Sequence, residues 1–253
     1  MKEENMALTQ SEQKVLAAST AIDTLIEQKK IFSGMKIGLG TGSTALPAVK
    51  RLAERIADGT LSDIKAVVTS FQTENYCKDL GIPVYTLNDP EIEGELDLAI
   101  DGADEITPEN HLIKGGDAAH LLEKIVEYNS KELVIVADES KSVAHVGTKF
   151  PLPVEIVPGA RKAVEKALAK LGAKCVLREG VRKCGPVITD NGNQILDCTW
   201  EKPVNPVEME EKIDGITGVV EVGFFTKIRH KAFIAHADGS VASDLTPDRT
   251  LLR

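Results

Sequence analysis

Three short stretches in the first half of the chain combine glycines with hydroxyl or charged side chains. The first, which we call the glycine loop, is residues 38–44 and reads Gly-Leu-Gly-Thr-Gly-Ser-Thr. Glycines let the backbone approach a ligand closely. The hydroxyls of Ser43 and Thr44, with the free N–H groups of a following helix, can hold a phosphate. The loop fits neither the dinucleotide-binding nor the nucleotide-triphosphate motif, so a phosphate site and a plain tight turn both stay open.

The second stretch is acidic. Asp101, Asp104 and Glu105 follow directly on the apolar run 96–100. Three carboxylates held close together repel one another, which raises the pKa of at least one of them and suits acid–base chemistry. A solvated turn and a divalent-metal site are the competing interpretations. Its position beside the other two stretches favours a role in catalysis.

The third stretch joins the lysine loop, residues 114–117 (Lys-Gly-Gly-Asp), to a helix. Lys114 can neutralise a developing oxyanion, and Glu123, further along the helix, can act as a general base. The alternative for Glu123 is an ion pair on a solvated helix face. His120 and Glu123 have the spacing of helical metal ligands, but nothing else completes a site, so we expect no bound metal.

These stretches need strands and helices to position them. Apolar runs predict strands, and periodic patterns between them predict helices, the first of which opens on a capping box at residues 9–12. The strands are expected at 36–39, 64–69, 83–87, 96–100 and 133–137, and the helices at 9–26, 45–57, 72–80 and 118–129. This alternation predicts a doubly wound, mostly parallel α/β sheet. Ligands bind such sheets at the carboxyl ends of the strands, where all three stretches lie.

The pattern changes after the Pro-Leu-Pro at 151–153. The expected order is then β-α-β-β-α-β, with a hairpin turn at the Asp-Asn-Gly-Asn of 190–193. That order is the split βαβ arrangement. We therefore place a small α+β domain at residues 151–225. The first domain comprises residues 1–150 plus 226–253, because the apolar run 232–235 is expected to return to the first sheet.

Composition narrows the class of function. The chain has 39 acidic and 30 basic residues and a net charge of −9, which argues against nucleic-acid partners and against anionic membranes. No apolar run approaches the roughly 20 residues that span a bilayer. The first 13 residues lack the pattern of a secretory signal or transit peptide. We expect a cytoplasmic protein, although a processed organellar form would look the same.

Together these motifs resemble the type A ribose-5-phosphate isomerases. The resemblance covers nearly the whole chain and rests on these segments: 40–44, 101–105, 112–116 with Glu123 and Lys124, 138–141 (Asp-Glu-Ser-Lys), 152–155 (Leu-Pro-Val-Glu) and 189–193 (Thr-Asp-Asn-Gly-Asn). It implies a Rossmann-like catalytic domain with a smaller ferredoxin-like domain. It also implies a cofactor-free aldose–ketose isomerase of the pentose phosphate pathway that interconverts D-ribose 5-phosphate and D-ribulose 5-phosphate through an enediolate. Members of the family are homodimers or homotetramers.

The resemblance also assigns roles to residues of this chain. Glu123 would move the proton between C2 and C1, and Lys114 would stabilise the enediolate. Asp101 and Asp104 would serve ring opening and proton transfer between the oxygens. The substrate-binding set implied by the resemblance is Gly40, Thr41, Gly42, Ser43, Thr44, Gly115, Gly116, Lys141 and Lys14.

The catalytic stretch departs from the family pattern. Asp117 and His120 stand in a segment where the family has another Gly, or Arg-Gly-Gly, and then Ala and Leu, and Leu122 stands where Arg is usual. Asp117 can cap a helix that begins near Ala118, repel the substrate, or join His120 in binding a metal. We expect the cap, since Asp is a favoured N-cap residue. A catalytically weak sugar-phosphate-binding homologue and another sugar-phosphate enzyme on a similar fold are the competing hypotheses for function.

Overall fold

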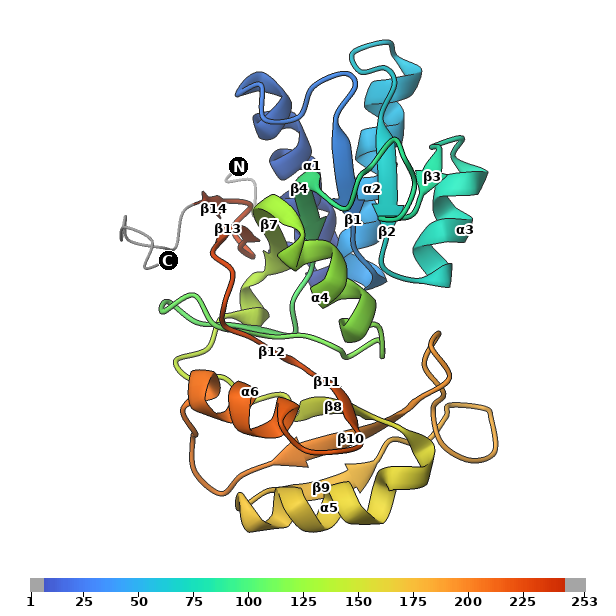
Figure 1. Cartoon of the computed structure of the whole chain (residues 1–253). Helices are drawn as coiled ribbons and strands as arrows, with labels where there is room; N and C mark the ends of the chain where they lie inside the picture. The colour runs from blue at the N-terminus through green and yellow to red at the C-terminus, as the bar shows by residue number, and fades with distance from the viewer. Residues whose placement is uncertain (1–6, 244–253) are drawn as a thin grey trace. The chain divides into compact units, whose positions relative to one another are not determined.

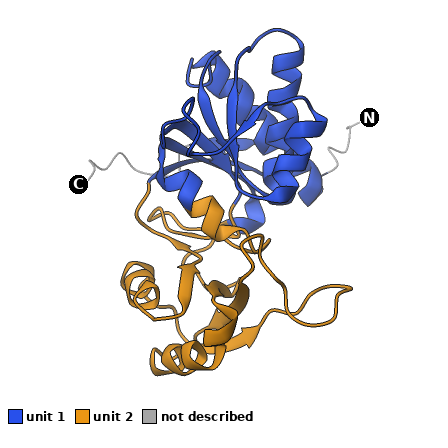
Figure 2. Cartoon of the chain, turned by 45° about the vertical axis from the view of Figure 1, so that its right-hand side comes forward, with its two compact units in different colours: residues 1–102, 125–141, 229–253 blue, residues 103–124, 142–228 orange. Residues whose placement is uncertain are grey.

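The computed structural model describes residues 7–243 of the chain. The chain forms two compact units, drawn in blue and orange in Figure 2. Unit 1 comprises residues 1–102, 125–141 and 229–253, and unit 2 comprises residues 103–124 and 142–228. Unit 2 is thus larger than the domain expected at 151–225, because residues 103–124, 142–150 and 226–228 group with it.

Unit 1 is built on a seven-stranded sheet with the order β14-β13-β7-β4-β1-β2-β3 (Figure 1). Its strands are β1 (Lys36–Leu39), β2 (Lys65–Val68), β3 (Val84–Tyr85), β4 (Leu96–Asp101), β7 (Ser130–Asp138), β13 (His230–Ala235) and β14 (Val241–Ser243). Every neighbouring pair is parallel except β13 with β14. The strand order reverses between β1 and β4, as in a doubly wound sheet. The predicted fold class and the return of residues 232–235 to this sheet are confirmed.

Helices cover both faces of this sheet. They are α1 (Gln10–Glu27), α2 (Gly42–Ala57), α3 (Phe71–Asp79) and α4 (His120–Tyr128). The buried side chains of Ile37 and Leu39 join those of α1 and α2 in one hydrophobic cluster. Gly38 lies on the opposite face, where an added Cβ would come within 2.5 Å of Val126 on α4. Successive strand residues point to opposite faces, so α4 packs across the sheet from α1 and α2.

The first helix confirms its predicted start. The Thr9 hydroxyl accepts the N–H of Glu12 at 3.3 Å, and the Glu12 carboxylate accepts the N–H of Thr9 at 2.8 Å. Each bond satisfies a backbone donor that the helix itself leaves unpaired. The helix after β1 begins at Gly42 rather than near residue 45, so the glycine loop runs directly into its first turn.

Unit 2 contains a four-stranded antiparallel sheet with the order β11-β8-β10-β9. Its elements are β8 (Leu152–Ile156), α5 (Arg161–Lys170), β9 (Lys174–Leu177), β10 (Gln194–Thr199), α6 (Pro206–Asp214) and β11 (Val219–Val222). The sequence order is therefore β-α-β-β-α-β, as predicted. Strand β10 begins at Gln194, directly after the turn expected at 190–193, and pairs with β9 over residues 196–199.

A second, three-stranded sheet explains why unit 2 reaches back to residue 103. It has the order β12-β6-β5 and consists of β5 (Glu105–Ile106), β6 (Leu112–Ile113) and β12 (Phe224–Phe225). The buried Glu105 carboxylate also accepts the backbone N–H groups of Gly147, Lys149 and Phe150. These long-range pairings tie the segment after β4 to residues 142–228.

Two motifs of unit 2 meet at one buried carboxylate. Glu155, from the Leu-Pro-Val-Glu motif, accepts the Thr189 hydroxyl at 2.8 Å and the Asn193 side-chain amide at 2.9 Å. Its side chain is buried, and that burial raises the pKa of the Glu155 carboxyl. The contact holds the Thr-Asp-Asn-Gly-Asn turn against β8.

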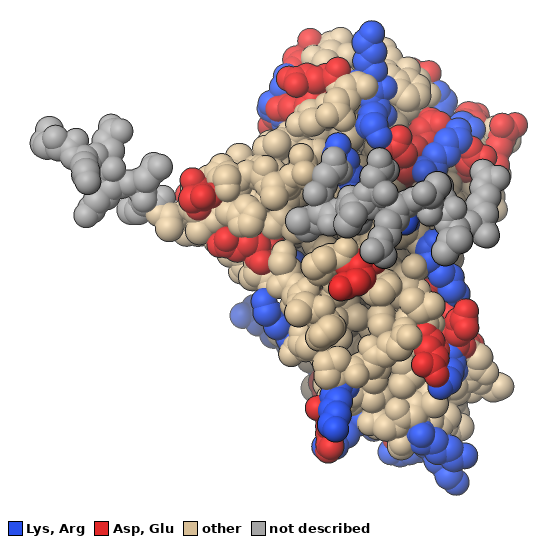
Figure 3. All heavy atoms as spheres, turned by 90° about the vertical axis from the view of Figure 1, so that its left-hand side faces the viewer, with Lys and Arg blue, Asp and Glu red and all other residues tan. Residues whose placement is uncertain are grey.

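Two surface and length properties bear on nucleic-acid and membrane partners. Acidic and basic side chains are interspersed over the face drawn in Figure 3. Within residues 7–243, no helix has the length and apolar character needed to cross a bilayer.

Removing the Glu155 carboxylate should destabilise the protein. Glu155→Ala leaves the Thr189 hydroxyl and the Asn193 amide without their acceptor, so we expect the free energy of unfolding to fall by about 1–3 kcal/mol. Urea unfolding followed by circular dichroism measures it. Glu165→Ala is the control: Glu165 pairs with Arg161 and Lys162 on α5, and such surface pairs are worth less than about 1 kcal/mol. Equal losses in the two variants would contradict the anchoring role of Glu155.

Candidate active site

The glycine loop is seated against the end of β4. The N–H of Gly40 donates to the carbonyl of Ile100 at 3.0 Å. The carboxylate of Asp101 then lies directly over Gly40: an added Cβ at Gly40 would be 1.9 Å from Asp101 Cγ. Asp101 is 1% exposed, and its Oδ1 accepts the N–H of Thr41 at 3.1 Å and of Gly102 at 2.6 Å. A residue with any side chain at position 40 is therefore incompatible with this carboxylate.

Polar side chains from the β2–α3 connection and from the first turn of α3 hold the glycine loop. The Thr41 hydroxyl lies 2.6 Å from that of Thr69 and 2.7 Å from that of Ser70. The Thr73 hydroxyl donates to the carbonyl of Gly40 at 2.7 Å. Gly42, at a φ of +91°, donates its N–H to the side chain of Gln72 at 3.2 Å. The loop backbone is thus fixed before any ligand arrives.

The loop presents hydrogen-bond donors at the start of α2. The first N–H groups of a helix lack partners within the helix and carry its positive dipole end. Ser43 is exposed, and Lys14 on α1 donates to its Oγ at 3.0 Å. An exposed hydroxyl, a lysine and a helix N-terminus are together suited to a phosphate group. This geometry favours the phosphate site over the plain turn.

The two lysines of the predicted binding set differ in placement. Lys14 reaches Ser43, as described above. Lys141 lies on a short 3-10 helix, Glu139–Lys141, and forms no hydrogen bond or ion pair with any described residue. The structure therefore brings Lys14, and not Lys141, into contact with the glycine loop.

The lysine loop depends on two glycines for a different close approach. Gly116 donates its N–H to Asp104 Oδ2 at 2.8 Å, and an added Cβ there would be 2.6 Å from Asp104 Oδ1. Gly115 has a φ of +105°, and an added Cβ would be 2.6 Å from His120 Nδ1. Both glycines therefore allow side chains to pack directly onto the loop backbone.

His120 is a buried core residue. It has no exposed surface, and its Nε2 lies 3.4 Å from the carbonyl of Glu221. Burial, followed by the charge of Lys124, lowers the pKa of the His120 imidazole to about 3. The imidazole is therefore neutral near pH 7 and fills the space under Gly115. Within residues 7–243, no three His, Cys, Asp or Glu side chains are grouped to hold a metal ion.

The predicted capping role of Asp117 is wrong. Helix α4 begins at His120, and the first intrahelical acceptor is the carbonyl of Ala119, which accepts the N–H of Glu123 at 3.0 Å. Asp117 lies earlier, in a turn closed by the N–H of Ala118 and the carbonyl of Gly115. Its side chain is exposed and forms no hydrogen bond with any described residue. The turn places the helix start two residues later than the sequence pattern predicts.

Lys114 and Glu123 form a buried pair of opposite charge. Lys114 Nζ lies 3.8 Å from Glu123 Oε1, and the two side chains are 2% and 7% exposed. The backbone N–H of Lys114 donates to the carbonyl of Gly223 at 2.9 Å. Its Nζ also lies 5.5 Å from the centre of the Phe225 ring, a favourable cation–π distance. Because Glu123 is buried, the alternative of a solvated ion pair on the helix face is wrong.

Each carboxylate of the acidic stretch accepts backbone N–H groups from a different segment. Asp101 bonds to the backbone around Gly40, Asp104 to Gly116, and Glu105 to residues 147–150. Each carboxylate is thus held by its own N–H donors. Glu105 has a structural role that its position in the motif did not reveal.

A polar pair that sequence reasoning missed holds the lysine loop. Arg178 Nη1 donates to the carbonyls of Gly115 and Gly116 at 2.8 and 3.0 Å. The same guanidinium forms two hydrogen bonds with Asp197, on β10. No local motif marks these two residues, since only the pairing of β9 with β10 brings them together.

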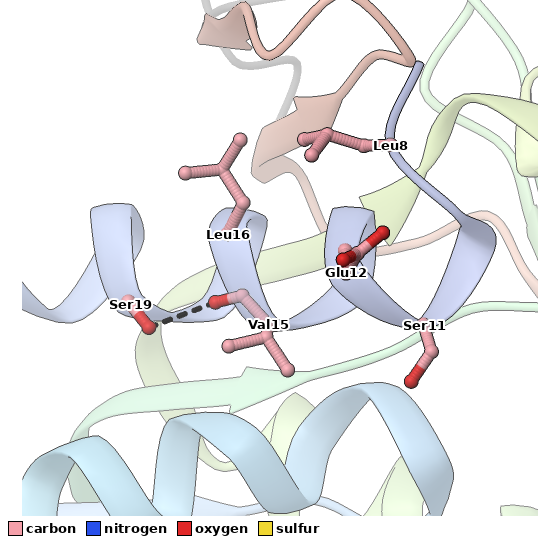
Figure 4. A pocket seen from close by; sticks show the side chains of 6 residues that line it. All are labelled: Leu8, Ser11, Glu12, Val15, Leu16 and Ser19. Carbon is pink, nitrogen blue, oxygen red and sulfur yellow. Dashed lines mark hydrogen bonds between the residues drawn. The ribbon is translucent and has the colours of Figure 1, made fainter. Parts of the chain in front are cut away.

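A depression on α1 contains none of the predicted site residues. Figure 4 shows its lining side chains, among which Ser19 donates to the carbonyl of Val15 at 2.8 Å. The lining residues are Leu8, Ser11, Glu12, Val15, Leu16 and Ser19.

Comparison with known proteins decides the family. The model of the ribose 5-phosphate isomerase A (phosphoriboisomerase A) family matches residues 65–239. A ribose-5-phosphate isomerase A of Treponema denticola is 57% identical over 233 residues, which cover 91% of this chain and 98% of that protein. The chain belongs to the ribose 5-phosphate isomerase A family. The resemblance inferred from the motifs is confirmed.

Solved structures of the family have the same fold. Ribose 5-phosphate isomerase A of Methanocaldococcus jannaschii is 41% identical, has a TM-score of 0.84, and covers 93% of this chain and 99% of its own. A D-ribose-5-phosphate isomerase in complex with phospho-erythronic acid is 39% identical, has a TM-score of 0.86, and covers the same shares of the two chains. The departures at Asp117 and His120 are thus accommodated within the family fold.

His120 should make stability depend on pH. The folded-state pKa of the His120 imidazole is lowered from 6.5 to about 3. Between these two pH values the imidazole is protonated in the unfolded chain and neutral in the folded protein. The free energy of unfolding therefore falls as the pH drops below about 6.5, by up to about 1.4 kcal/mol per pH unit from this group. His120→Gln has no such titrating group. As the pH falls from 7 to 4.5 we therefore expect the parent to lose more stability than the variant, so that the difference between their free energies of unfolding becomes smaller.

Urea unfolding at four pH values measures this difference. His236→Gln is the control, because His236 is 39% exposed. A gap that stays constant with pH in His120→Gln would contradict the assignment of a buried neutral imidazole.

Proposed function

We propose that this chain interconverts D-ribose 5-phosphate and D-ribulose 5-phosphate by proton transfer. The observation that carries the proposal is the buried Glu123 carboxylate beside the Lys114 ammonium at 3.8 Å, in a member of the isomerase family. Proton transfer next to a carbonyl needs a base and a cation that stabilises the resulting oxyanion. The phospho-erythronic acid bound by a structural relative is a phosphorylated sugar acid, which supports a sugar-phosphate substrate here.

Glu123 is the base in this proposal. In the open-chain aldose it removes the proton from C2, and the electron pair moves to form the C1–C2 double bond of an enediolate with negative charge on O1. Lys114 stabilises that charge. Glu123 returns the proton to C1, the O2 hydroxyl passes its proton to O1, and the carbonyl forms at C2. Every proton removed is returned and the substrate is neither oxidised nor reduced overall, so the reaction needs no redox cofactor.

Asp101 and Asp104 complete the proton transfers. We assign to them the opening of the sugar ring and the movement of a proton between O1 and O2, as the family resemblance implies. Both carboxylates accept backbone N–H groups, which holds each in one orientation. A carboxylate that is oriented before substrate binds loses little entropy in the reaction.

The substrate phosphate is assigned to the glycine loop. The N-terminus of α2, the hydroxyls of Ser43 and Thr44, and Lys14 provide the donors, and the contact between Lys14 and Ser43 supports this. Gly40, Thr41 and Gly42 shape the backbone, and Gly115 and Gly116 border the reacting carbons. Lys141 does not contact the loop, and its role as a phosphate ligand stays a prediction from the family resemblance.

Three further predictions concern the oligomeric state, the compartment and the pathway. We propose that the enzyme is a homodimer or homotetramer that works in the cytoplasm on the pentose phosphate pathway. These statements rest on the resemblance to the family.

Replacing Glu123 tests the reaction directly. Purified full-length protein should convert ribose 5-phosphate in heavy water and incorporate deuterium from solvent. Glu123→Gln keeps the shape of the side chain and removes the proton acceptor, so we expect kcat to fall by about 10²–10⁴-fold. Glu127→Gln, an equally buried residue of the same helix, is the matched control. A parent protein that binds the substrate without turnover would support the weak-binding homologue, and near-normal turnover in Glu123→Gln would rule out Glu123 as the base.

Replacing Lys14 tests phosphate recognition. Lys14→Met removes a charged donor, so we expect KM for ribose 5-phosphate to rise about tenfold while kcat changes little. The activity on free ribose should be very low and unaffected by this substitution, because ribose carries no phosphate. Lys30→Met is the control, since Lys30 pairs with Glu132 at the surface. The same rise in KM for both sugars would argue against a phosphate contact.

A further inference from the structure

Arg178 is partly buried and contacts the lysine loop. The residue follows directly after the last residue of β9, and its side chain is 15% exposed. Nη1 donates to the carbonyl oxygens of Gly115 at 2.8 Å and of Gly116 at 3.0 Å. One guanidinium nitrogen thus holds two successive carbonyls of the loop that follows Lys114.

Asp197 fixes the direction of that guanidinium. Its two carboxylate oxygens accept Nε at 2.9 Å and Nη2 at 2.5 Å, which is the bidentate geometry of a strong charge-assisted pair. Asp197 lies opposite Val176 in the β9–β10 pairing, and Arg178 is two residues beyond Val176. The two side chains are therefore diagonal neighbours on one face of the sheet. The rigid strand pair determines where Nη1 points.

The contact is transmitted through a single peptide group. The carbonyl of Gly115 and the N–H of Gly116 belong to the same planar trans unit and point in opposite directions. The carbonyl end accepts Arg178, and the N–H end donates to Asp104 Oδ2 at 2.8 Å. A cation at the carbonyl end polarises the peptide and strengthens its N–H as a donor. A continuous line of hydrogen bonds therefore joins Asp197, Arg178, the peptide and Asp104.

The loop needs such a constraint because of its composition. Glycine has access to more backbone conformations than any other residue, and Gly115 and Gly116 are adjacent. Neither position has room for a side chain, since a Cβ would meet His120 in one case and Asp104 in the other. Side chains at these two positions therefore cannot stiffen the loop, whose own constraint is the turn bond from the Ala118 N–H to the Gly115 carbonyl. Arg178 holds it from outside, through the backbone carbonyls.

We propose that Arg178, oriented by Asp197, is a positioning residue for the isomerase reaction. It holds the Gly115–Gly116 peptide so that Asp104 and the adjacent Lys114 keep the geometry that proton transfer requires. The inference rests on the proposed catalytic roles of Asp104 and Lys114. Arg178 itself acts through the peptide group. A displacement of about 1 Å in a catalytic group can reduce the rate 10²-fold, which sets the scale of the expected effect.

Kinetics of Arg178 variants test the proposal. In Arg178→Ala we expect kcat to fall about 10–100-fold, with a much smaller change in KM. Arg178→Lys keeps the charge but cannot engage Asp197 and both carbonyls at once, so it should recover only part of kcat. Arg161→Ala is the matched control, because Arg161 also forms an ion pair in unit 2 but on the exposed side of α5. Unchanged kcat in Arg178→Ala would overturn the proposal.

Chemical rescue separates positioning from a general loss of folding. Guanidinium chloride supplies the missing group to Arg178→Ala. A concentration of a few tens of millimolar is far below the roughly molar range in which it denatures proteins. We expect kcat to increase severalfold in that variant and to stay unchanged in the parent and in Arg161→Ala. A loss of kcat that guanidinium does not restore, while Arg178→Ala unfolds at the same urea concentration as the parent, would overturn the positioning role.

A spectroscopic measurement distinguishes failure of this inference from failure of the proposed function. The amide proton of Gly116 reports its hydrogen bond to Asp104. We expect its NMR resonance to move upfield in Arg178→Ala and to stay in place in Arg161→Ala. If the parent protein has no activity on ribose 5-phosphate, the proposed function fails, and the Gly116 resonance still decides whether Arg178 orients the peptide. An unmoved resonance would overturn the inference whatever the activity.

Discussion

The close contact between a carboxylate and a glycine backbone is the constraint on which both loops depend. Asp101 lies over Gly40, and Asp104 lies against Gly116, with no room for a Cβ in either place. Each carboxylate in return accepts N–H groups of the loop it touches. A buried carboxylate without donors would be costly, so the loop conformation and the position of the acid stabilise each other. In unit 1 the pairing of β1 with β4 makes this contact possible, because it places residue 101 next to residue 40.

Contacts with opposite charges and with an aromatic ring keep Lys114 inside the protein. Lys114 is 2% exposed beside Glu123, and Lys124 on the same helix is paired with Glu210 and Glu221. Burying such groups costs free energy that their pairing only partly offsets. Phe225 lies within cation–π distance of both ammonium groups, at 5.5 and 4.8 Å. The arrangement holds charges in place for chemistry at some cost in stability, which is common at sites that act on substrates.

The departures from the family pattern at Asp117 and His120 lie beside the groups to which we assign catalysis. His120 occupies space that Gly115 leaves open, and it does so as a neutral side chain. Asp117 lies at the surface, in a turn before α4. The Lys114–Glu123 pair and the bond between Asp104 and Gly116 are both present beside these two residues. The groups to which we assign the isomerase reaction are therefore present beside the residues that depart from the family pattern.

The sequence by itself determined the fold class, the capping box of α1, the split βαβ order of the second unit and the family. These features are readable because they depend on local periodicity, on glycine spacing and on motifs of a few residues. Only the tertiary structure decided that Lys14 reaches Ser43, that Glu105 supports residues 147–150, that α4 begins at His120, and that Arg178 and Asp197 hold the lysine loop. Most of these contacts join segments that are far apart in the chain, and the start of α4 depends on a turn that packs on His120. Strand order and register set such contacts, and a local pattern of residue types contains neither.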